Sequence, residues 1–556
     1  EATAQWFGAS DAVRHAELAV GVRLFKLALG CNAVLLALAA YFAPRGASCE
    51  ALAGGVRAEP RCAPQAKWWL TAALALALLL RLKALPVGIS FDEIDTLVHY
   101  ARKPLLEVAT TFDSQNQHLL FSLLARVCFI AFGESVWAVR LPAVLLGVAS
   151  IWALYRFALL VVERREALAA AVLLTLSYHH VWFSQNARGY TGLLFFTLLG
   201  THEFLRMLSE RAPRGFARPL RYGAWMALAT LIHATAVFAV AAHGAVWLAT
   251  LWTSRKQACG ANRRVPALGF LFAVSLAWLV YALVLPQFVH TLLRPTMPGA
   301  TTEWKDPLWL VRETLAGISR GLPGGAVTLA VGAFVALLGL RSFWKQGPAL
   351  LGTFMLGTVI TAAALLATHH NLWPRMFFFS AGFYVLIALR GVVDGVRIVV
   401  ARVAPALVER ATSLALASLC ALSALSLPSA WLPKQDFEGP RAYLARHAAP
   451  GDAIATVDMT VMPYRDYFTE PWNAVDTVDA LARLESAHPV TWIVFTTPTR
   501  MKAAQPQIWE RIQSDYVTAR TFWGTLGGSE VVVAVRGRAA PVDSDAAPGV
   551  SEGISR

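Results

Sequence analysis

The sequence predicts an α-helical polytopic membrane protein that ends in a small soluble α/β domain. Two observations lead to this prediction. The chain has 556 residues, of which 56% are hydrophobic and only 15% are charged, whereas soluble domains carry about 25% charged residues. Windows that approach the roughly 20 apolar residues of one membrane span recur as far as residue 432 and then stop. We therefore expect about 11–13 transmembrane segments, followed by a domain in water.

The transmembrane segments are predicted from these windows in chain order. The window 118–133 is short and follows the polar residues 113–118, so we expect that it does not cross the membrane fully. Segment 289–322 contains prolines and then an amphipathic stretch from Leu308, which is typical of a loop and an interfacial helix that covers a site. The windows are 21–43, 67–87, 118–133, 137–160, 166–182, 189–206, 222–233, 235–252, 266–288, 323–340, 349–368, 372–390 and 408–431.

Composition divides the chain into four parts. Residues 1–66 add one hydrophobic helix, and residues 67–432 hold the main transmembrane domain. Residues 433–540 form the α/β domain, and the tail 541–556 is expected to be disordered because it has few apolar residues. No cleavable signal is evident and the first residue is not Met, so we expect the natural chain to begin upstream.

Helix and strand patterns alternate in the C-terminal domain, which is typical of a small α/β layer. The domain has no glycine-rich phosphate loop and no nucleophile elbow. We therefore expect it to bind the acceptor or to support the site. Strands are predicted at 452–458, 490–496 and 530–536, and helices at 439–448, 478–487 and 505–516.

The positive charge of the chain marks its membrane topology. The formal net charge is +14, with 49 Lys and Arg residues. Because these residues gather between the apolar windows, the positive-inside rule assigns those loops to the cytoplasm, and nucleic acid is not expected as a partner. The excess charge also favours contact with anionic membrane lipid. The basic loops are 163–166, 206–221, 253–264, 341–346 and 390–402.

This assignment places loops 184–190, 233–235 and 369–375 on the outer face together with the C-terminal domain. The stretch "FDEID" (91–95) joins them if window 118–133 does not cross. The loop that contains Cys49 and Cys62 is then cytoplasmic, and six cysteines scattered over the chain are no disulfide framework. In the alternative topology every window crosses, and "FDEID" lies inside.

Two adjacent carboxylates, Asp92 and Glu93, follow directly after a hydrophobic helix in "ISFDEIDTLVHYARK" (89–103). Acidic residues stabilise the first turn of a helix, so they could simply cap a helix that starts near Ile94. They could also hold or activate a substrate. The local sequence by itself favours the cap.

The region 67–207 as a whole resembles the GT-C type of polyprenyl-phosphate-sugar-dependent glycosyltransferases, which include protein mannosyltransferases and aminoarabinose transferases. The resemblance lies in the order of several elements. "FDEIDTLVHYARKPLLE" resembles the first external loop of the family, with its acidic pair, and "VWAVRLPAVLLG" its Arg-Leu-Pro helix start. "DSQNQHLLFSLLARVCFIAFGES" resembles the His-Pro-Pro-Leu-Tyr-Tyr helix without its prolines. "VWFSQNARGYTGLLFF" resembles the Ser-Gln-Glu-Ala-Arg-x-Tyr element, with Asn186 where Glu is common.

The resemblance implies a GT-C type helical bundle and a catalytic base at Asp92, with Glu93 orienting the base or the acceptor. A carboxylate that takes the proton of an acceptor hydroxyl supplies the nucleophile that a lipid-phosphate sugar needs. Arginine binds phosphate oxygens in a bidentate manner, which makes Arg375 the candidate for the leaving group. An interfacial arginine beside Trp373 would explain that pattern equally well. Further substrate-binding candidates are His118, Gln185, Arg188 and Tyr190.

The resemblance also raises the question of a metal ion. Some members of the family use a divalent ion, such as Mg²⁺ or Mn²⁺, that neutralises the leaving phosphate. Asp92 with a polar residue at 185–186 could take part in such a site. Asn186 in place of Glu makes this site less acidic and puts metal dependence in doubt.

The sequence therefore predicts an integral membrane glycosyltransferase. It would move a sugar from a polyprenyl-phosphate donor to an extracytoplasmic acceptor, with inversion, in a bacterial inner membrane and with its active site on the periplasmic face. Two alternatives remain open. A lipid-linked-sugar flippase or transporter would show paired broken helices and internal repeats, and a non-catalytic membrane assembly protein would leave "FDEID" without a role.

Overall fold

The computed structural model describes residues 12–41, 54–57, 64–210, 215–254, 260–293, 302–322 and 324–538. The chain divides into two compact units. Unit 1 comprises Glu1–Leu85, Lys103–Arg294 and Asp306–Ala430, and unit 2 comprises Pro86–Arg102, Pro295–Lys305 and Trp431–Arg556. The predicted tail 541–556, together with Cys49 and Cys62, lies outside the described residues.

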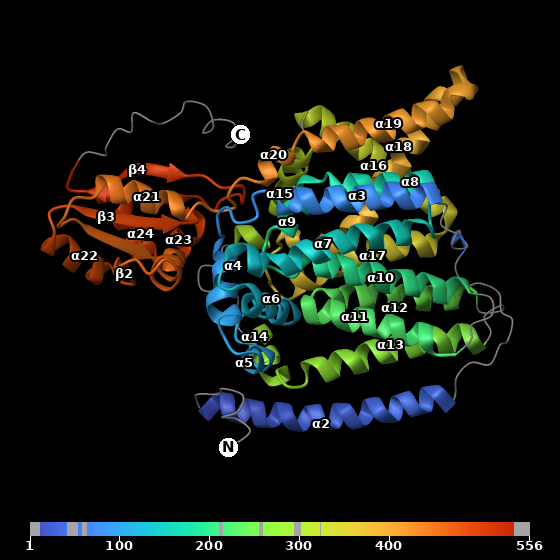
Figure 1. Cartoon of the computed structure of the whole chain (residues 1–556), viewed down its shortest axis with the longest axis horizontal. Coiled ribbons are helices and arrows are strands. Elements are labelled where there is room, and N and C mark those ends of the chain that lie inside the picture. The colour runs from blue at the N-terminus through green and yellow to red at the C-terminus, as the bar shows by residue number, and fades with distance from the viewer. Residues whose placement is uncertain are drawn as a thin grey trace. The chain divides into compact units, whose positions relative to one another are not determined.

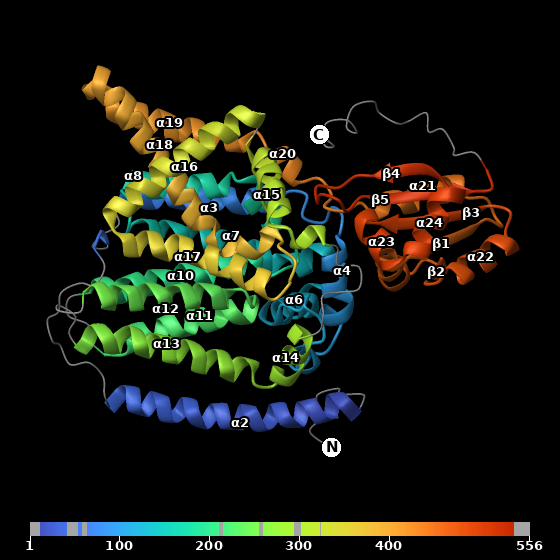
Figure 2. The same cartoon turned by 180° about the vertical axis from the view of Figure 1, so that it is seen from behind.

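Unit 1 is a bundle of helices that run mostly side by side (Figure 1). In both views α2 lies along α13 at the edge of the bundle (Figure 2), and Asn32 Nδ2 donates to the carbonyl of Ser275 at 3.1 Å. The helices are α2 (Ala12–Tyr41), α3 (Pro64–Leu82), α5 (Leu105–Ala109), α6 (Leu119–Phe132), α7 (Val136–Ala158), α8 (Arg164–Thr175), α9 (Tyr178–Ser184), α10 (Tyr190–Ser209), α11 (Ala217–Ile232), α12 (Ala236–Thr253), α13 (Gly260–Tyr281), α14 (Leu285–Leu293), α15 (Pro307–Gly321), α16 (Gly325–Gln346), α17 (Pro348–Ala367), α18 (Ala381–Val403), α19 (Val408–Ala424) and α20 (Leu427–Ala430), with 3-10 turns at Pro374–Ser380 and Pro405–Leu407.

The described helices confirm an integral membrane protein, although fewer of them qualify as spans than the 11–13 predicted. Eight are long and apolar enough to cross a membrane, or nine if the bent pair α8 and α9 forms one span. Three further helices of the bundle fall short of that standard. Helix α11 has only 16 residues, α3 carries Lys67 and Arg81, and α10 carries Glu203 and Arg206.

At one end of unit 1, which we call the polar end, residues from the candidate motifs and from the stretches beside them lie close together. Gln185 Nε2 donates to the carbonyls of Arg81 at 2.9 Å and Lys83 at 2.5 Å. Arg140 Nη1 donates to the carbonyl of Leu85 at 2.7 Å, so helix α7 begins at this end. Arg140 is the arginine of the Arg-Leu-Pro motif. Its buried guanidinium satisfies a buried carbonyl beyond the end of α3.

The opposite end, which we call the basic end, holds the loops with the predicted cytoplasmic charges. The backbone N–H of Arg57 donates to the carbonyl of Leu160 at 2.7 Å. Gln346 Nε2 donates to the carbonyls of Gly55 and Val161, both at 2.7 Å. Helix α7 therefore runs from the polar end to the basic end, and residues 54–57, between α2 and α3, lie at the basic end, as the preferred topology predicts.

Helix α6 does not run the length of the bundle. It begins after His118 at the polar end, where Arg188 Nη2 lies 2.9 Å from His118 Nε2, and α7 begins at the same end. Its 14 residues span only about 21 Å, less than the roughly 30 Å of a membrane core. The predicted short window is thus confirmed, and the alternative in which every window crosses does not fit the bundle.

The amphipathic stretch after Leu308 forms α15. Four of its apolar side chains are exposed on the surface of unit 1. Their spacing places them along a single stripe of the helix. Trp309 lies on another face and packs edge-on against Trp373, with ring centroids 5.4 Å apart. The exposed stripe consists of Leu308, Val311, Leu315 and Ile318.

Unit 2 is built on a five-stranded sheet with the order β2-β1-β3-β5-β4 (Figure 1). Strands β2, β1 and β3 are parallel, while β5 pairs antiparallel with both β3 and β4. The three predicted strands and three predicted helices are confirmed as β1, β3, β5, α21, α22 and α24. The elements are α4 (Phe91–Thr96), a π-helical turn (Leu97–Ala101), α21 (Glu438–His447), β1 (Ala453–Val457), a π-helical turn (Pro463–Tyr467), β2 (Asn473–Val475), α22 (Val478–Ala487), β3 (Thr491–Thr496), α23 (Pro498–Ala504), α24 (Pro506–Asp515), β4 (Val517–Phe522) and β5 (Val531–Arg536).

The core of unit 2 lies between the sheet and the helices α22, α23 and α24. Leu481, Met501 and Ile508 of these helices are buried against the strands. They pack on the alternate strand residues that face this side of the sheet. On the other side Tyr443 of α21 packs edge-on against Trp492 of β3. The strands missed by the sequence, β2 and β4, carry mostly exposed or half-buried residues, so they lack the apolar runs that reveal a buried strand.

Candidate active site

In unit 2 the stretch "FDEID" forms the short helix α4, and its two adjacent carboxylates have different environments. Glu93 is fully buried, with 0% of its surface exposed. Its Oε2 accepts from the backbone N–H of Ser90 at 3.1 Å and from Ser90 Oγ at 2.9 Å. The bond from the Ser90 N–H to the Glu93 side chain belongs to a capping box, which stabilises the start of a helix.

Asp92 is the half-buried carboxylate of the pair. Its backbone carbonyl accepts from Thr96 Oγ1 at 2.9 Å. One turn further along the segment, Asp95 Oδ1 lies 2.6 Å from Nδ1 of the half-exposed His99. Of the two predicted catalytic carboxylates, Asp92 is therefore the more exposed one, and Glu93 caps the start of the helix.

In unit 1 three predicted residues meet at the polar end: His118, Arg188 and Tyr190. All three are buried. His118 Nδ1 accepts from the backbone N–H of Gly189 at 2.9 Å, and Nε2 faces Arg188 Nη2 at 2.9 Å. A ring nitrogen that accepts this hydrogen bond from Gly189 carries no proton, so the imidazole is neutral. The Tyr190 ring packs edge-on against His118, with centroids 5.5 Å apart.

Arg188 is held by neutral groups. Its Nη1 donates to the carbonyl of Asn116 at 3.0 Å and also to the side-chain oxygen of that residue. Its Nε is buried without a hydrogen-bond partner among the described residues. A buried guanidinium N–H without a partner is costly, and an anion at this place would satisfy it.

Arg375 contributes a second cation to the polar end. Burial lowers the pKa of His118 well below its usual value, and the charges of Arg188, His233 and Arg375 lower it further. The guanidinium of Arg375 packs on the ring of Trp373 at 5.0 Å from its centroid. Arg375 therefore makes the contact expected of an interfacial anchor and also supplies a positive charge to the polar end.

His233 and Asn116 belong to this cluster, although the sequence singled out neither as a ligand. The rings of His118 and His233 lie 4.5 Å apart, and His233 Nδ1 is 2.8 Å from Thr235 Oγ1. For His233 the available signal was topological, because loop 233–235 is assigned to the outer face together with loop 184–190, which contains Arg188. We call Asn116, His118, Arg188, His233 and Arg375 the cationic cluster of unit 1.

Gln185 is not part of the cationic cluster. Its amide caps the end of α3 through the carbonyls of Arg81 and Lys83, as described above. The neighbouring Asn186 is buried, and its Oδ1 has no hydrogen-bond partner among the described residues. Gln185 was predicted to bind substrate, but its side-chain N–H group donates to backbone carbonyls instead.

A divalent ion finds no ligand set within either unit. The described residues contain no group of three His, Cys, Asp or Glu side chains that could hold one. Glu93 spends its Oε2 on Ser90, and Asn186 supplies a neutral oxygen where a carboxylate was expected. No chemical step below depends on a metal ion.

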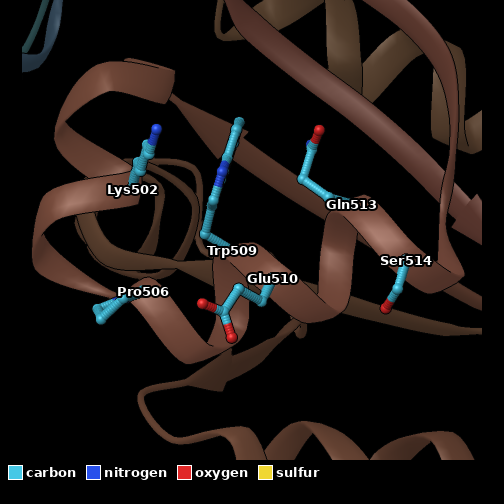
Figure 3. A pocket seen from close by; sticks show the side chains of 6 residues that line it. All are labelled: Lys502, Pro506, Trp509, Glu510, Gln513 and Ser514. Atoms are coloured by element: carbon cyan, nitrogen blue, oxygen red, sulfur yellow. The ribbon is translucent and has the colours of Figure 1, made fainter.

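A surface hollow of about 530 Å³ lies elsewhere in unit 2, on α23 and α24 (Figure 3). Trp509 stands between Lys502 and Gln513 in this hollow. None of its lining residues belongs to α4, and it is shallow and open, so it is not a candidate for the reaction. Its lining residues are Lys502, Pro506, Trp509, Glu510, Gln513 and Ser514.

Comparisons with known proteins agree with this picture. Residues 116–282 match the family model described as dolichyl-phosphate-mannose-protein mannosyltransferase. The match includes His118, Arg188 and His233, and it confirms the resemblance stated above. The chain is therefore similar, over these residues, to membrane glycosyltransferases that use polyprenyl-phosphate-linked sugars. No curated protein is significantly similar to it.

Solved structures resemble the chain only distantly. ArnT from Cupriavidus metallidurans bound to undecaprenyl phosphate is 14% identical, with a TM-score of 0.46 over 84% of this chain and 98% of that chain. The oligosaccharyltransferase AglB from Archaeoglobus fulgidus, in complex with an inhibitory peptide and a dolichol-phosphate, is 12% identical, with a TM-score of 0.45 over 84% and 74%. The Archaeoglobus enzyme in complex with Zn and sulfate is 12% identical, with a TM-score of 0.44 over 83% and 72%. At these scores the likenesses carry no argument about the residues of this chain.

Proposed function

We propose that the chain transfers a sugar from a polyprenyl phosphate to an acceptor hydroxyl, with Asp92 as the general base and the cationic cluster as the site of the leaving phosphate. The observation that carries this proposal is the cationic cluster itself. Arg188 donates to the neutral Asn116 there and keeps a buried N–H without a partner among the described residues, and Arg375 adds a second positive charge that acts on His118. A phosphate is the ligand that such paired guanidinium groups recognise best.

The proposed step follows from these roles. The carboxylate of Asp92 takes the proton of the acceptor hydroxyl as its oxygen forms a bond to the anomeric carbon. The bond between that carbon and the phosphate oxygen breaks, and the electron pair leaves with the polyprenyl phosphate. Arg188 and Arg375 stabilise the charge that develops on the phosphate. A single displacement of this kind inverts the anomeric configuration.

His118 has a positioning role in this proposal. The neutral ring accepts from the backbone N–H of Gly189 and lies against Arg188, so it orients the guanidinium without adding a charge of its own. Tyr190 closes the other side of the ring. A neutral histidine at this place leaves the positive charge on the arginines, where a phosphate can reach it.

The location and the ion requirement belong to the proposal as well. We place the chain in a bacterial inner membrane, with the polar end on the periplasmic face, because the basic loops gather at the opposite end. A requirement for Mg²⁺ or Mn²⁺ remains a prediction that concerns Asp92, and treatment with EDTA followed by restoration of each ion would test it. The acceptor classes that offer the hydroxyl needed for this step are glycans, lipids and proteins.

Binding of the carrier lipid tests the phosphate site without knowledge of the sugar. The chain, reconstituted in nanodiscs, should bind undecaprenyl phosphate more tightly than undecaprenol, which lacks the phosphate. Transfer should then appear with at least one member of a panel of undecaprenyl-phosphate sugars. Equal affinity for undecaprenyl phosphate and undecaprenol would contradict the assigned phosphate site.

A further inference from the structure

The segment that carries Asp92 folds with the α/β domain. Pro86–Arg102 and Trp431–Arg556 belong to the same compact unit, although several hundred residues separate them along the chain. The contacts between the two stretches are specific hydrogen bonds. They lie at both ends of the segment, with α4 between them.

The first contact fastens the start of α4. The backbone N–H of Phe91, the first residue of the helix, donates to Gln435 Oε1 at 2.8 Å. The first N–H groups of a helix have no partner inside the helix, so this bond satisfies a group that would otherwise be orphaned. Gln435 is 2% exposed, and its Nε2 faces the carbonyl of Ser529 at 3.4 Å.

The second contact fastens the end of the segment. Arg102 Nη1 donates to the carbonyl of Asp466 at 2.8 Å, in the π-helical turn Pro463–Tyr467. Near the other end, Gly88 has φ +53 and passes so close to Pro433 that a Cβ at residue 88 would lie 3.1 Å from the Pro433 Cβ. The segment is therefore held at three places by residues of the C-terminal part of unit 2.

We propose that Gln435 is a positioning residue for Asp92, and that the α/β domain serves to hold the base in place. Asp92 is the residue next to Phe91, so the bond to Gln435 sets the position and direction of the turn that presents the carboxylate. A base acts only within hydrogen-bond reach of the proton it takes, and a displacement of about 1 Å can cost about 100-fold in rate. This inference rests on the proposed function in naming Asp92 as the base.

The test compares Gln435→Met with Gln435→Glu in the full chain. Methionine has a similar volume but no acceptor for the Phe91 N–H, whereas glutamate keeps an acceptor oxygen at a helix N-terminus, where a negative charge is favourable. The matched control is Gln513→Met, which removes an exposed glutamine of α24. Arg102→Met is the second variant, used if Gln435→Met does not fold, because it removes the other hydrogen bond that holds the segment.

Hydrogen–deuterium exchange measures the anchoring directly. We expect residues 89–93 to exchange about fivefold faster in Gln435→Met, the change that corresponds to one hydrogen bond of about 1 kcal/mol. Gln435→Glu and Gln513→Met should keep the exchange of the native protein. In Arg102→Met the faster exchange should appear at residues 97–101. Unchanged exchange at 89–93 in Gln435→Met would overturn the proposal, whatever the protein catalyses.

Turnover then separates positioning from a merely structural role. In Gln435→Met, kcat should fall by about tenfold to 100-fold, with the KM for the polyprenyl-phosphate sugar unchanged. Gln435→Glu should recover most of the rate and move the acidic limb of the pH–rate profile to higher pH, because a second negative charge near Asp92 favours its protonated form.

The failures are distinguishable. Faster exchange with normal turnover in Gln435→Met, while Asp92→Asn is inactive, would overturn the positioning role and leave the base assignment standing. Normal turnover in both Gln435→Met and Asp92→Asn would overturn the base assignment and, with it, the proposed function.

Discussion

At the scale of single residues, burial separates two carboxylates that look alike in the sequence. Glu93 lies inside unit 2, where its Oε2 accepts hydrogen bonds from Ser90, whereas Asp92 is half-buried. The same distinction applies to Gln185, whose amide is used by backbone carbonyls, and to Arg188, whose Nε has no partner among the described residues. A side chain that is already satisfied has less to offer a substrate.

Asp92→Asn should abolish transfer while leaving the fold intact, because asparagine keeps the volume and removes the base. The loss expected for one general base is about 10²–10⁴-fold in kcat. Turnover is measured with a polyprenyl-phosphate sugar, and binding of undecaprenyl phosphate should stay at the native level. Asp479→Asn, an exposed aspartate of the same unit, is the matched control. A substantial rate in Asp92→Asn would remove this residue from the mechanism.

Glu93→Gln should behave differently from Asp92→Asn. Glutamine still offers an oxygen to the Ser90 N–H and hydroxyl, so transfer should remain within a few-fold of the native rate. Glu93→Ala loses the capping box, which is worth about 1 kcal/mol, and should loosen residues 89–96 in hydrogen exchange. Complete inactivity of a well-folded Glu93→Gln protein would instead give Glu93 a direct chemical role.

Arg375→Ala should weaken the binding of undecaprenyl phosphate, and Arg375→Lys should restore it only in part, since lysine lacks the planar fork of arginine. The expected loss on removal of one charged hydrogen-bonding group is about 1.5–3 kcal/mol. Arg188→Ala should act in the same direction. Undecaprenol serves as the control ligand, because its binding should not change. Native affinity in Arg375→Ala would reduce this residue to an interfacial anchor on Trp373.

At the scale of elements, the break between α8 and α9 shapes the polar end. The two helices are bent by 58°, which frees carbonyls at the end of α8. The buried Arg81 supplies the donors: its Nη2 lies 3.3 Å from the carbonyl of Leu174 and its Nη1 3.4 Å from that of Thr175. Its Nε also donates to Ser184 Oγ at 3.1 Å. Arg81 thus holds the helix that leads into the Arg188 loop.

Arg81→Met should lower the free energy of unfolding by at least about 2 kcal/mol, because it leaves buried carbonyls unsatisfied. Thermal unfolding of the purified chain in detergent is the measurement. Arg410→Met, at an exposed arginine of α19, should leave the unfolding temperature unchanged. An equally small effect of both substitutions would mean that the bend is held by packing rather than by the guanidinium.

At the scale of the whole molecule, the two ends of unit 1 determine which loops share a face of the membrane. Leu85, His118 and Arg188 lie at the polar end, and Gly55, Leu160 and Gln346 lie at the basic end. The chemistry proposed here requires the segment that follows Leu85 to share its face with the cationic cluster. The topology is therefore a direct test of the mechanism.

Single cysteines in a background without the natural ones should report this topology in intact cells. Asp113→Cys and His369→Cys, both at exposed positions, should react with a membrane-impermeant thiol reagent. Lys345→Cys, at the basic end, should react only after the membrane is permeabilised. Labelling of Lys345→Cys but not of Asp113→Cys in intact cells would contradict the proposed orientation.

The sequence by itself determined the class of the fold and the candidate residues. Apolar windows, basic loops and alternating strand and helix patterns are local properties, because each records the environment of one stretch of chain. They predicted a helical membrane domain, the α/β elements at β1, β3 and β5, and the short helix after His118. The ordered motifs likewise singled out Asp92, His118, Arg188 and Tyr190 without any coordinates.

Only the tertiary structure decided how these residues are used. Glu93 turned inward, His233 joined His118 from a distant loop, and Gln435 met the Phe91 N–H across 344 residues of sequence. A buried glutamine that anchors a helix has no local pattern to distinguish it from any other glutamine. Its partner is set by which surfaces pack together, and that depends on the whole chain rather than on the residues beside it.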